Sequence, residues 1–231
     1  EVSLQSAASV FENIDSGKYE VIPIGITRSG DWYHYTGKVE YIVNNTWCED
    51  IGHLWPVVVS HNRSVKEFLE LRADKYTILE ADLAFPVLHG KNGEDGTLQG
   101  LFELAGIPVI GCNTLSSALC MDKDRAHKLV SLAGISIPKS VTFKRPEKEM
   151  ALKEIVSVLT FPLFVKPVRA GSSFGITRVT KKEELDAAAE LALEHDSEVI
   201  AEEAVSGFEV GCAVLGSDVL TVGRVDEIEL S

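Results

Sequence analysis

Apolar segments of two periodicities alternate along the first half of the chain. Apolar residues recur at helical spacing over 4–14 and 97–105, and Gly106 is placed to end the second of these helices. Strand-like apolar runs cover 19–27, 57–60, 76–80, 83–88 and 107–110, and another helix is expected over 116–121. Because strands and helices take turns, we expect an α/β domain with a mostly parallel sheet covered on both faces.

The pattern changes after Asp122, where we place a domain boundary. Helices are expected over 123–133, 147–159 and 183–194, and strands over 141–143, 161–167, 176–180, 198–203 and 209–215. The strands at 161–167 and 176–180 are joined only by a short loop, as in an antiparallel pair. This order indicates an α+β unit, an antiparallel sheet with helices on one side.

Composition and charge narrow the function. The 231 residues carry a formal net charge of −13, which disfavours nonspecific binding to nucleic acid and to anionic membranes. No apolar run approaches the ~20 residues of a membrane helix, and no secretion signal is visible. The four cysteines are widely spaced, so we expect buried free thiols in a reducing cytoplasm and neither disulfides nor a metal site.

A glycine- and serine-rich loop, 169–175, separates two of the predicted strands. Backbone N–H groups around Gly171, Ser172, Ser173 and Gly175 could close over phosphate oxygens. An ordinary hairpin turn would have the same composition, and the loop lacks the Gly-Lys-Ser/Thr of a Walker A motif. The loop alone therefore leaves both interpretations open.

Two lysines strengthen the phosphate interpretation. Lys166 stands in an apolar strand just before the loop, where its ammonium needs an anion or a route to water. Lys123 begins the first helix after the boundary, although a lone lysine there could equally be a surface residue. Together with the loop, the two lysines could neutralise a triphosphate in an otherwise acidic protein. Further along, Glu202, Glu203 and Glu209 could serve a nucleotide or be solvated acids.

The segment 89–100 (HGKNGEDGTLQG) is the most specific in the chain. It follows a predicted strand and leads into a helix, where ligands bind in open α/β sheets. His89 is therefore a candidate for contact with a substrate. Glu94 and Asp95 lie near a helix N-terminus, where acids are favourable whatever the function.

This segment resembles the signature of D-alanine–D-alanine ligases, which belong to the ATP-grasp superfamily. Similar motifs follow in order at 117–119, 121–123, 165–167 and 171–175. The resemblance implies an ATP-grasp architecture with three parts. These are an N-terminal Rossmann-like substrate-binding domain (1–122), a central antiparallel-sheet subdomain that binds ATP (123–206), and the start of a C-terminal subdomain that is mostly absent (207–231).

The resemblance also implies roles for individual residues. Lys123 and Lys166 would hold the ATP phosphates, which the loop from Gly171 to Gly175 would clamp. Glu202, Glu203 and Val205 would line the adenine, and Glu209 would bind the ribose. On the substrate side, His89 and Glu94 would lie by the first D-alanine. Ser172 would join a hydrogen-bonded set that holds a closed lid.

The implied reaction is phosphoryl transfer from ATP to D-alanine, followed by attack of the amine of a second D-amino acid. Mg²⁺ would bridge the phosphates, held by residues expected beyond position 231. The sequences at 24–27 and 222–227 look most like those of the vancomycin-resistance branch of Van G type, whose members make D-alanyl-D-serine for cell-wall precursors. The resemblance further suggests a homodimer. The alternatives are another ATP-grasp carboxylate–amine ligase, a non-catalytic nucleotide or D-amino-acid binding protein, and an α/β domain with incidental glycines.

Overall fold

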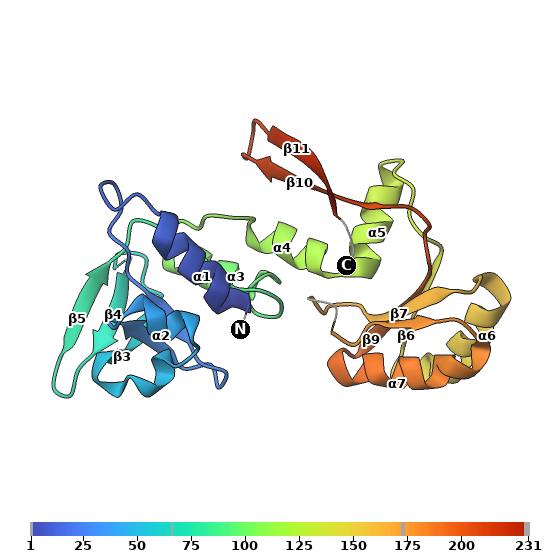
Figure 1. The fold of residues 1–231 in the computed structure, drawn as a ribbon, viewed down its shortest axis with the longest axis horizontal. Helices are drawn as coiled ribbons and strands as arrows, with labels where there is room; N and C mark the ends of the chain where they lie inside the picture. The colour runs from blue at the N-terminus through green and yellow to red at the C-terminus, as the bar shows by residue number, and fades with distance from the viewer. Residues whose placement is uncertain (1, 66, 172–173, 229–231) are drawn as a thin grey trace.

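The structure is a computed structural model, and it describes residues 2–65, 67–171 and 174–228. Two groups of elements lie at opposite sides of the molecule and are joined through α4 and α5 (Figure 1). The first group contains the helices α1 (Val2–Asn13), α2 (Val39–Val43), α3 (Thr97–Ala105) and α4 (Thr114–Met121), with the 3-10 turns η1 (Trp47–Glu49) and η2 (Ile51–His53). Its strands are β1 (Ile24–Ile26), β2 (Trp32–Tyr35), β3 (Leu54–Val59), β4 (Glu67–Leu71) and β5 (Tyr76–Glu80).

These five strands form one sheet in the order β1-β2-β3-β4-β5, and every neighbouring pair is antiparallel. The expected parallel sheet is therefore wrong for these strands. Parallel pairing occurs between the segments expected to be strands at 83–88 and 107–110, but only as a single bridge, Ala84 to Val109. Strands that follow one another through short turns pair antiparallel, because a parallel connection needs a crossover of a dozen or more residues.

Helix α3 packs against this sheet through aromatic contacts. The Phe102 ring meets the rings of Phe68 and Trp32 edge to face, with centroids 6.0 Å and 6.4 Å apart. Gly106 ends the helix in the left-handed conformation, at φ 75°, as the sequence predicts. The helix in turn fixes the segment that precedes it, which carries His89 and Glu94.

The second group is built on a four-stranded antiparallel sheet in the order β6-β9-β7-β8, which confirms the central sheet predicted from the sequence. Its strands are β6 (Ser140–Lys144), β7 (Leu163–Pro167), β8 (Thr177–Val179) and β9 (Glu198–Glu203). Its helices are α5 (Lys123–Leu132), α6 (Lys148–Val158) and α7 (Leu185–His195), with 3-10 turns η3 (Arg145–Glu147) and η4 (Lys182–Glu184).

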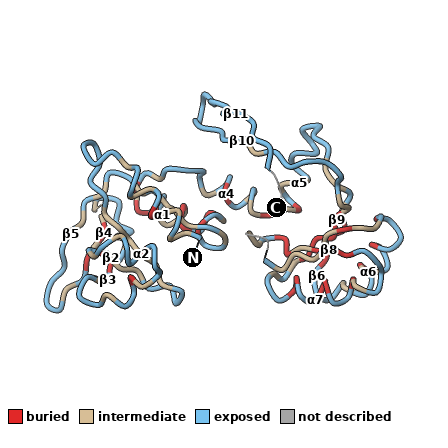
Figure 2. The backbone as a smooth tube through the Cα atoms, in the orientation of Figure 1, coloured by how far each residue is buried: buried red, intermediate tan, exposed pale blue. Residues whose placement is uncertain are grey.

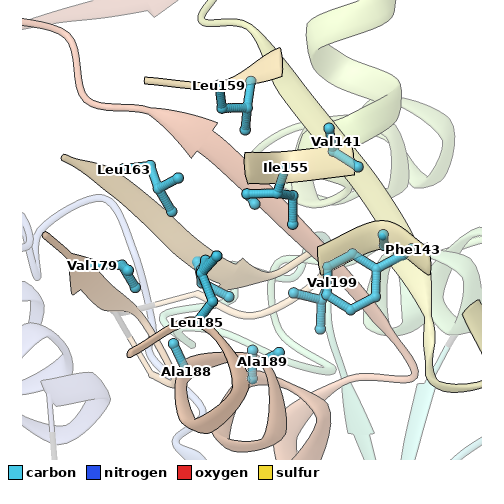
Figure 3. Close-up of a cluster of buried hydrophobic side chains, with 14 of the residues drawn as sticks. Val141, Phe143, Ile155, Leu159, Leu163, Val179, Leu185, Ala188, Ala189 and Val199 are labelled. Carbon is cyan, nitrogen blue, oxygen red and sulfur yellow. The ribbon is translucent and has the colours of Figure 1, made fainter. Parts of the chain in front are cut away.

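The hydrophobic core of this group assigns the two faces of its sheet. Leu163 of β7 points into a cluster with Ile155 of α6 and Leu185 of α7 (Figure 3). Val165 of β7 belongs to the same cluster. Since side chains alternate along a strand, Lys166 projects from the opposite face of β7. On β9, Val199 and Ala201 join the same core, so Glu202 projects to the face that Lys166 occupies. The polar candidates thus lie away from α6 and α7.

The remaining elements, β10 (Glu209–Leu215) and β11 (Thr221–Ile228), form a hairpin whose residues are nearly all exposed (Figure 2). The four cysteines are free, but all are exposed, so their expected burial is wrong. Within the described ranges, no helix combines the length and the apolar character needed to cross a bilayer.

Candidate functional site

Lys123 lies at the junction of helix α5 and the glycine-rich loop. Asp122 caps the helix by accepting a hydrogen bond from the Arg125 backbone N–H, which fixes where α5 begins. The Lys123 ammonium donates to the carbonyl oxygens of Ala170, at 2.7 Å, and Val168, at 3.4 Å. Burial, together with the nearby Lys166 charge, holds the pKa of Lys123 below its usual range. Lys123 is thus hydrogen-bonded to the start of the glycine-rich loop and is not an ordinary solvated surface lysine.

Lys166 is paired with an acid on the neighbouring strand. Its ammonium contacts the Glu202 carboxylate and lies 5.3 Å from the centre of the Phe164 ring. Glu202 is opposite Phe164 in the strand register, so Lys166 and Glu202 are diagonal neighbours on one face of the sheet. Lys166 and Lys123 therefore stand close together, with Glu202 balancing the charge of Lys166. The two ammonium groups are the part of this arrangement that suits a polyanion.

The loop is held at both ends by the junction of α7 and β9. The Arg169 guanidinium donates to both oxygens of Asp196, at 2.7 Å and 3.1 Å, and its backbone N–H donates to Asp196 Oδ2 at 2.7 Å. Gly175 has φ 69°, and a methyl group there would lie 2.5 Å from Cδ2 of His195 and 2.9 Å from Cγ of Pro167. Glycine is therefore required at 175 for its conformation and for space. Ser172 and Ser173 lie outside the described residues.

His89 is held by helix α1 and by its own loop. Its Nε2 lies 3.0 Å from Ser6 Oγ, and its backbone N–H donates to Ser3 Oγ at 3.1 Å. Its Nδ1 is 3.6 Å from Glu94 Oε1, while the other Glu94 oxygen accepts from the Gly90 N–H at 2.5 Å. Glu94 therefore orders the loop around the imidazole.

Asp95 has a structural role in the same loop. It accepts hydrogen bonds from the backbone N–H groups of Asn92 and Thr97, at 2.8 Å and 3.0 Å. Burial by itself raises the pKa of Asp95, but these hydrogen bonds outweigh it and hold the pKa below its usual range. The carboxylate thus stabilises the turn and the start of α3 by these hydrogen bonds.

The two loops meet at glycines. A methyl group on Gly171 would lie 3.3 Å from the Gly90 Cα and 3.7 Å from Glu94 Oε2. The glycine-rich loop of the second group and the His89 loop of the first are thus in contact, although about 80 residues separate them in the sequence. A molecule held by Lys123 and Lys166 could therefore reach one held at His89.

The other predicted residues are less closely engaged. The Glu203 carboxylate accepts hydrogen bonds from the Thr160 N–H and hydroxyl, at 3.0 Å and 2.7 Å, and these lower its pKa. Glu203 also projects from the face opposite to Glu202, so only its backbone could line a ligand beside Glu202. Val205 lies two residues beyond the end of β9 and Glu209 begins β10, and both are exposed.

His127 belongs to the candidate site, although it was not among the residues predicted from the sequence. It follows Lys123 by four residues on α5, and its Nδ1 lies 3.9 Å from Glu202 Oε2. The four-residue spacing was the available signal, since it places both side chains on one face of a helix. No group of three or more His, Cys, Asp or Glu side chains in the described part of the chain could hold a metal ion.

Comparison with known proteins gives one consistent family. The model for the D-ala D-ala ligase N-terminus matches residues 1–112, and the model for the D-ala D-ala ligase C-terminus matches residues 129–231. The crystal structure of VanG D-Ala:D-Ser ligase from Enterococcus faecalis is 74% identical, with a TM-score of 0.91, over 99% of this chain and 65% of that one.

Curated relatives agree. The vancomycin B-type resistance protein VanB of Enterococcus faecalis is 44% identical over 100% of this chain and 64% of its own length. A D-alanine--D-alanine ligase of Caldicellulosiruptor bescii is 42% identical over 99% of this chain and 63% of its own length. The chain thus spans just under two thirds of the length of these relatives.

Proposed function

Because this chain belongs to the D-alanine–D-alanine ligase family, we propose that the protein is an ATP-dependent ligase that joins D-alanine to D-serine. The observation that carries this proposal is the close approach of Gly171 to Gly90 and Glu94, where an added methyl group would touch both. It puts the glycine-rich loop beside Lys123 and Lys166 next to the His89 loop. The identity of 74% to a D-Ala:D-Ser ligase favours D-serine as the second substrate. D-alanine as the second substrate is the alternative that the family itself offers.

The ATP phosphates lie, in this proposal, between Lys123, Lys166 and the loop from Gly171 to Gly175. The two lysines supply cationic donors, and glycine positions let backbone N–H groups approach the phosphate oxygens closely. Lys123 is already tied to the Ala170 carbonyl, so a nucleotide that engages this lysine also contacts the root of the loop. Ser172 and Ser173, outside the described residues, remain predicted members of this loop.

The base and the ribose lie further along β9. Glu202 faces the same side of the sheet as Lys166 and is positioned to accept from the exocyclic amine of adenine. Glu203 contributes its backbone, because its carboxylate is bound to Thr160. Val205 is exposed and supplies an apolar surface for the base, and Glu209 binds the ribose hydroxyls.

D-alanine lies beside His89, whose imidazole is held by Ser6 and Glu94. An oxygen of its carboxylate attacks the γ-phosphorus of ATP, ADP departs, and an acyl phosphate forms. The amine of the second D-amino acid then attacks the acyl carbon, phosphate leaves, and the peptide bond is formed. The cationic cluster of Lys123 and Lys166 stabilises the charge that develops during transfer. Mg²⁺ bound with the nucleotide would neutralise part of the charge of the phosphates during transfer.

The setting of the reaction follows from the same proposal. The dipeptide is a precursor of peptidoglycan, and a D-serine terminus in place of D-alanine would serve vancomycin resistance. The enzyme would work in the cytoplasm, where ATP is available, as a homodimer. The division of the chain into units at 1–122, 123–206 and 207–231 is part of this proposal.

Substitution of Lys166 tests the ATP site. In the full-length protein, Lys166→Ala removes a charge-assisted contact of about 1.5–3 kcal/mol, so ATP should bind about 10- to 150-fold more weakly. Calorimetric titration with ATP measures this, and thermal unfolding without nucleotide checks that the variant is folded. Lys153→Ala removes an exposed lysine on α6 and should leave ATP affinity unchanged.

Two results would contradict the proposal. The first is unchanged ATP affinity in folded Lys166→Ala protein, which would remove Lys166 from the site. The second is a wild-type protein that binds ATP but releases no ADP when D-alanine and a second D-amino acid are added. That result would favour a binding protein or a ligase for other substrates.

A further inference from the structure

Two buried polar atoms of the site face each other without forming a hydrogen bond. Glu202 is 6% exposed, and its Oε2 has no hydrogen-bond partner among the described atoms. The same is true of Nδ1 of His127, and the two atoms are 3.9 Å apart. This separation is about 1 Å beyond hydrogen-bonding distance. Buried polar atoms are rarely left unpaired, so this pair points to a contact made in another state of the site.

The backbone directs His127 to this position. Lys123 and His127 are four residues apart on α5, and Lys123 is fixed by its hydrogen bonds to Val168 and Ala170. The face of α5 that carries both residues must therefore be turned toward the ends of β7 and β9. His127 is not an incidental neighbour of Glu202, because moving it away would also move Lys123.

Glu202 has a single cationic contact within hydrogen-bonding distance among the described residues, and a nucleotide would compete for it. Its Oε1 is held by Lys166, which our proposed function assigns to the ATP phosphates. When Lys166 turns toward the phosphates, the buried Glu202 carboxylate loses its cationic partner. The adenine amine of our proposed function can engage one carboxylate oxygen, but the other oxygen is left close to an arriving polyanion and still needs a donor.

The other cations of α5 are already engaged. Lys128 is paired with Asp124, and Arg125 is paired with Asp122. His127 lies beside Glu202 of β9, whose other oxygen is held by Lys166 of β7, and Lys123 is one turn earlier on the same helix. Helix α4, which packs against α5, carries Cys120 as its titratable residue and no charged side chain. Among these, His127 is the group that can take over the second oxygen of Glu202.

We propose that His127 is a positioning residue of the nucleotide site, which hydrogen-bonds Glu202 Oε2 through Nδ1–H when Lys166 turns to the phosphates. The inference rests on the proposed ATP site. In this proposal His127 does not contact the reacting atoms. It acts through Glu202 and so frees Lys166 for the nucleotide. The movement required is the closing of the 3.9 Å gap to hydrogen-bonding distance.

Variants of His127 with and without a donor test this role by ATP titration of the full-length protein in the absence of amino acids. His127→Leu keeps much of the side-chain volume but has no donor, and should weaken ATP binding about tenfold or more, as expected for a lost hydrogen bond to a charged group. His127→Asn carries an amide N–H near the position of Nδ1 and should stay within about threefold of wild type. His61→Leu makes the same change at an exposed position between β3 and β4 and should bind ATP as wild type does.

The dependence on Glu202 separates positioning from a general structural role. In a Glu202→Gln background the buried charge is gone, so adding His127→Leu should weaken ATP binding further by less than about twofold. A full tenfold effect in that background would overturn the proposal, as would His127→Leu protein that binds ATP like wild type.

A spectroscopic measurement on wild-type protein covers the case in which His127→Leu does not fold. In ¹⁵N-histidine-labelled wild-type protein, the Nδ1 resonance of His127, assigned by its loss in His127→Asn, should shift on addition of ATP. An unchanged resonance at saturating ATP would overturn the inference while leaving the ATP site intact. A wild-type protein that does not bind ATP would overturn the proposed function and this inference together.

Discussion

Two residues near the proposed ATP site, Lys166 and Gly175, can be explained individually by the structure. Lys166 interrupts an apolar strand, and the structure explains it by a pairing with Glu202 across the β7–β9 ladder. Gly175 occupies a left-handed position against His195 and Pro167 that a side chain could not share. Lys166 was singled out from the sequence because it breaks an apolar pattern, and Gly175 because it belongs to a glycine- and serine-rich loop.

The proposed function places the imidazole of His89 on the substrate side, so its removal should affect D-alanine more than ATP. In the full-length protein we expect His89→Ala to raise the KM for D-alanine about tenfold or more, as for a lost hydrogen bond to a charged group. ATP affinity should change less than threefold. Initial rates of ADP release at varied D-alanine, beside ATP titration, measure the two effects separately.

Ser6→Ala provides the matched comparison. It removes the hydroxyl that lies 3.0 Å from His89 Nε2 but leaves the ring in place, so its effect on KM should be the smaller of the two. Saturation with D-alanine that is the same in His89→Ala and wild-type protein would withdraw the substrate-side assignment.

Other residues could not be placed from the sequence, for identifiable reasons. Glu202 and Glu203 are adjacent acids in one strand, and only the register of β9 shows that Glu203 faces Thr160. His127 has no motif around it, and its importance depends on how α5 packs. The cysteines look like core residues by type, yet all four are exposed.

At the scale of elements, the glycine-rich loop is positioned by the α7–β9 junction. Asp196 accepts hydrogen bonds from the backbone N–H and the guanidinium of Arg169, and its carboxylate is 8% exposed. Burial alone raises the pKa of Asp196, but Arg169 outweighs this effect, and the pKa lies below its usual range. The ionised form is therefore favoured by folding.

Asp196→Asn should destabilise the protein by about 2 kcal/mol at neutral pH, since it loses charge-assisted hydrogen bonds to Arg169. Because the folded pKa is lowered, this contribution is complete above the unfolded value of about 3.9 and is lost as the pH falls through the folded value. Unfolding by urea at a series of pH values should show wild type and variant converging in acid.

Asp186→Asn is the matched control. It breaks a pair with Lys148 in which the carboxylate is 68% exposed, and such pairs contribute little. A stability gap for Asp196→Asn that does not narrow on acidification would contradict the account of this ion pair.

The sequence predicted the elements of the second group better than the pairing of the first. The loop between the predicted strands 161–167 and 176–180 is so short that they can pair only as antiparallel neighbours. The structure has them as the antiparallel pair β7 and β8. In the first group, the strands β2 and β4 were not predicted, so their neighbours seemed separated by long connections. The turns at 27–31 and 72–75 are too short for parallel crossovers, which is why β1–β2 and β4–β5 pair antiparallel. The connection 36–53 between β2 and β3 is long enough for either direction, so only the structure shows that this pair is antiparallel.

At the scale of the whole molecule, the proposed activity depends on two groups of elements with separate hydrophobic cores. Their contact at Gly171 and Gly90 is what brings the phosphate loop to the His89 loop. The motifs at 89–100 and 165–175 each predicted one half of this candidate site. That the two halves lie close together could not be predicted from the sequence and is seen only in the folded structure. The division at 122 and 206 remains a prediction.

The most direct test of the central claim is identification of the product by mass. The full-length protein is supplied with ATP, Mg²⁺, D-alanine and D-serine, and ADP release is followed in parallel. The account predicts that D-alanyl-D-serine is the main dipeptide and that ADP release requires D-alanine. D-alanyl-D-alanine alone would retain the ligase and contradict the choice of D-serine, and the absence of any dipeptide despite ATP binding would contradict the proposed function.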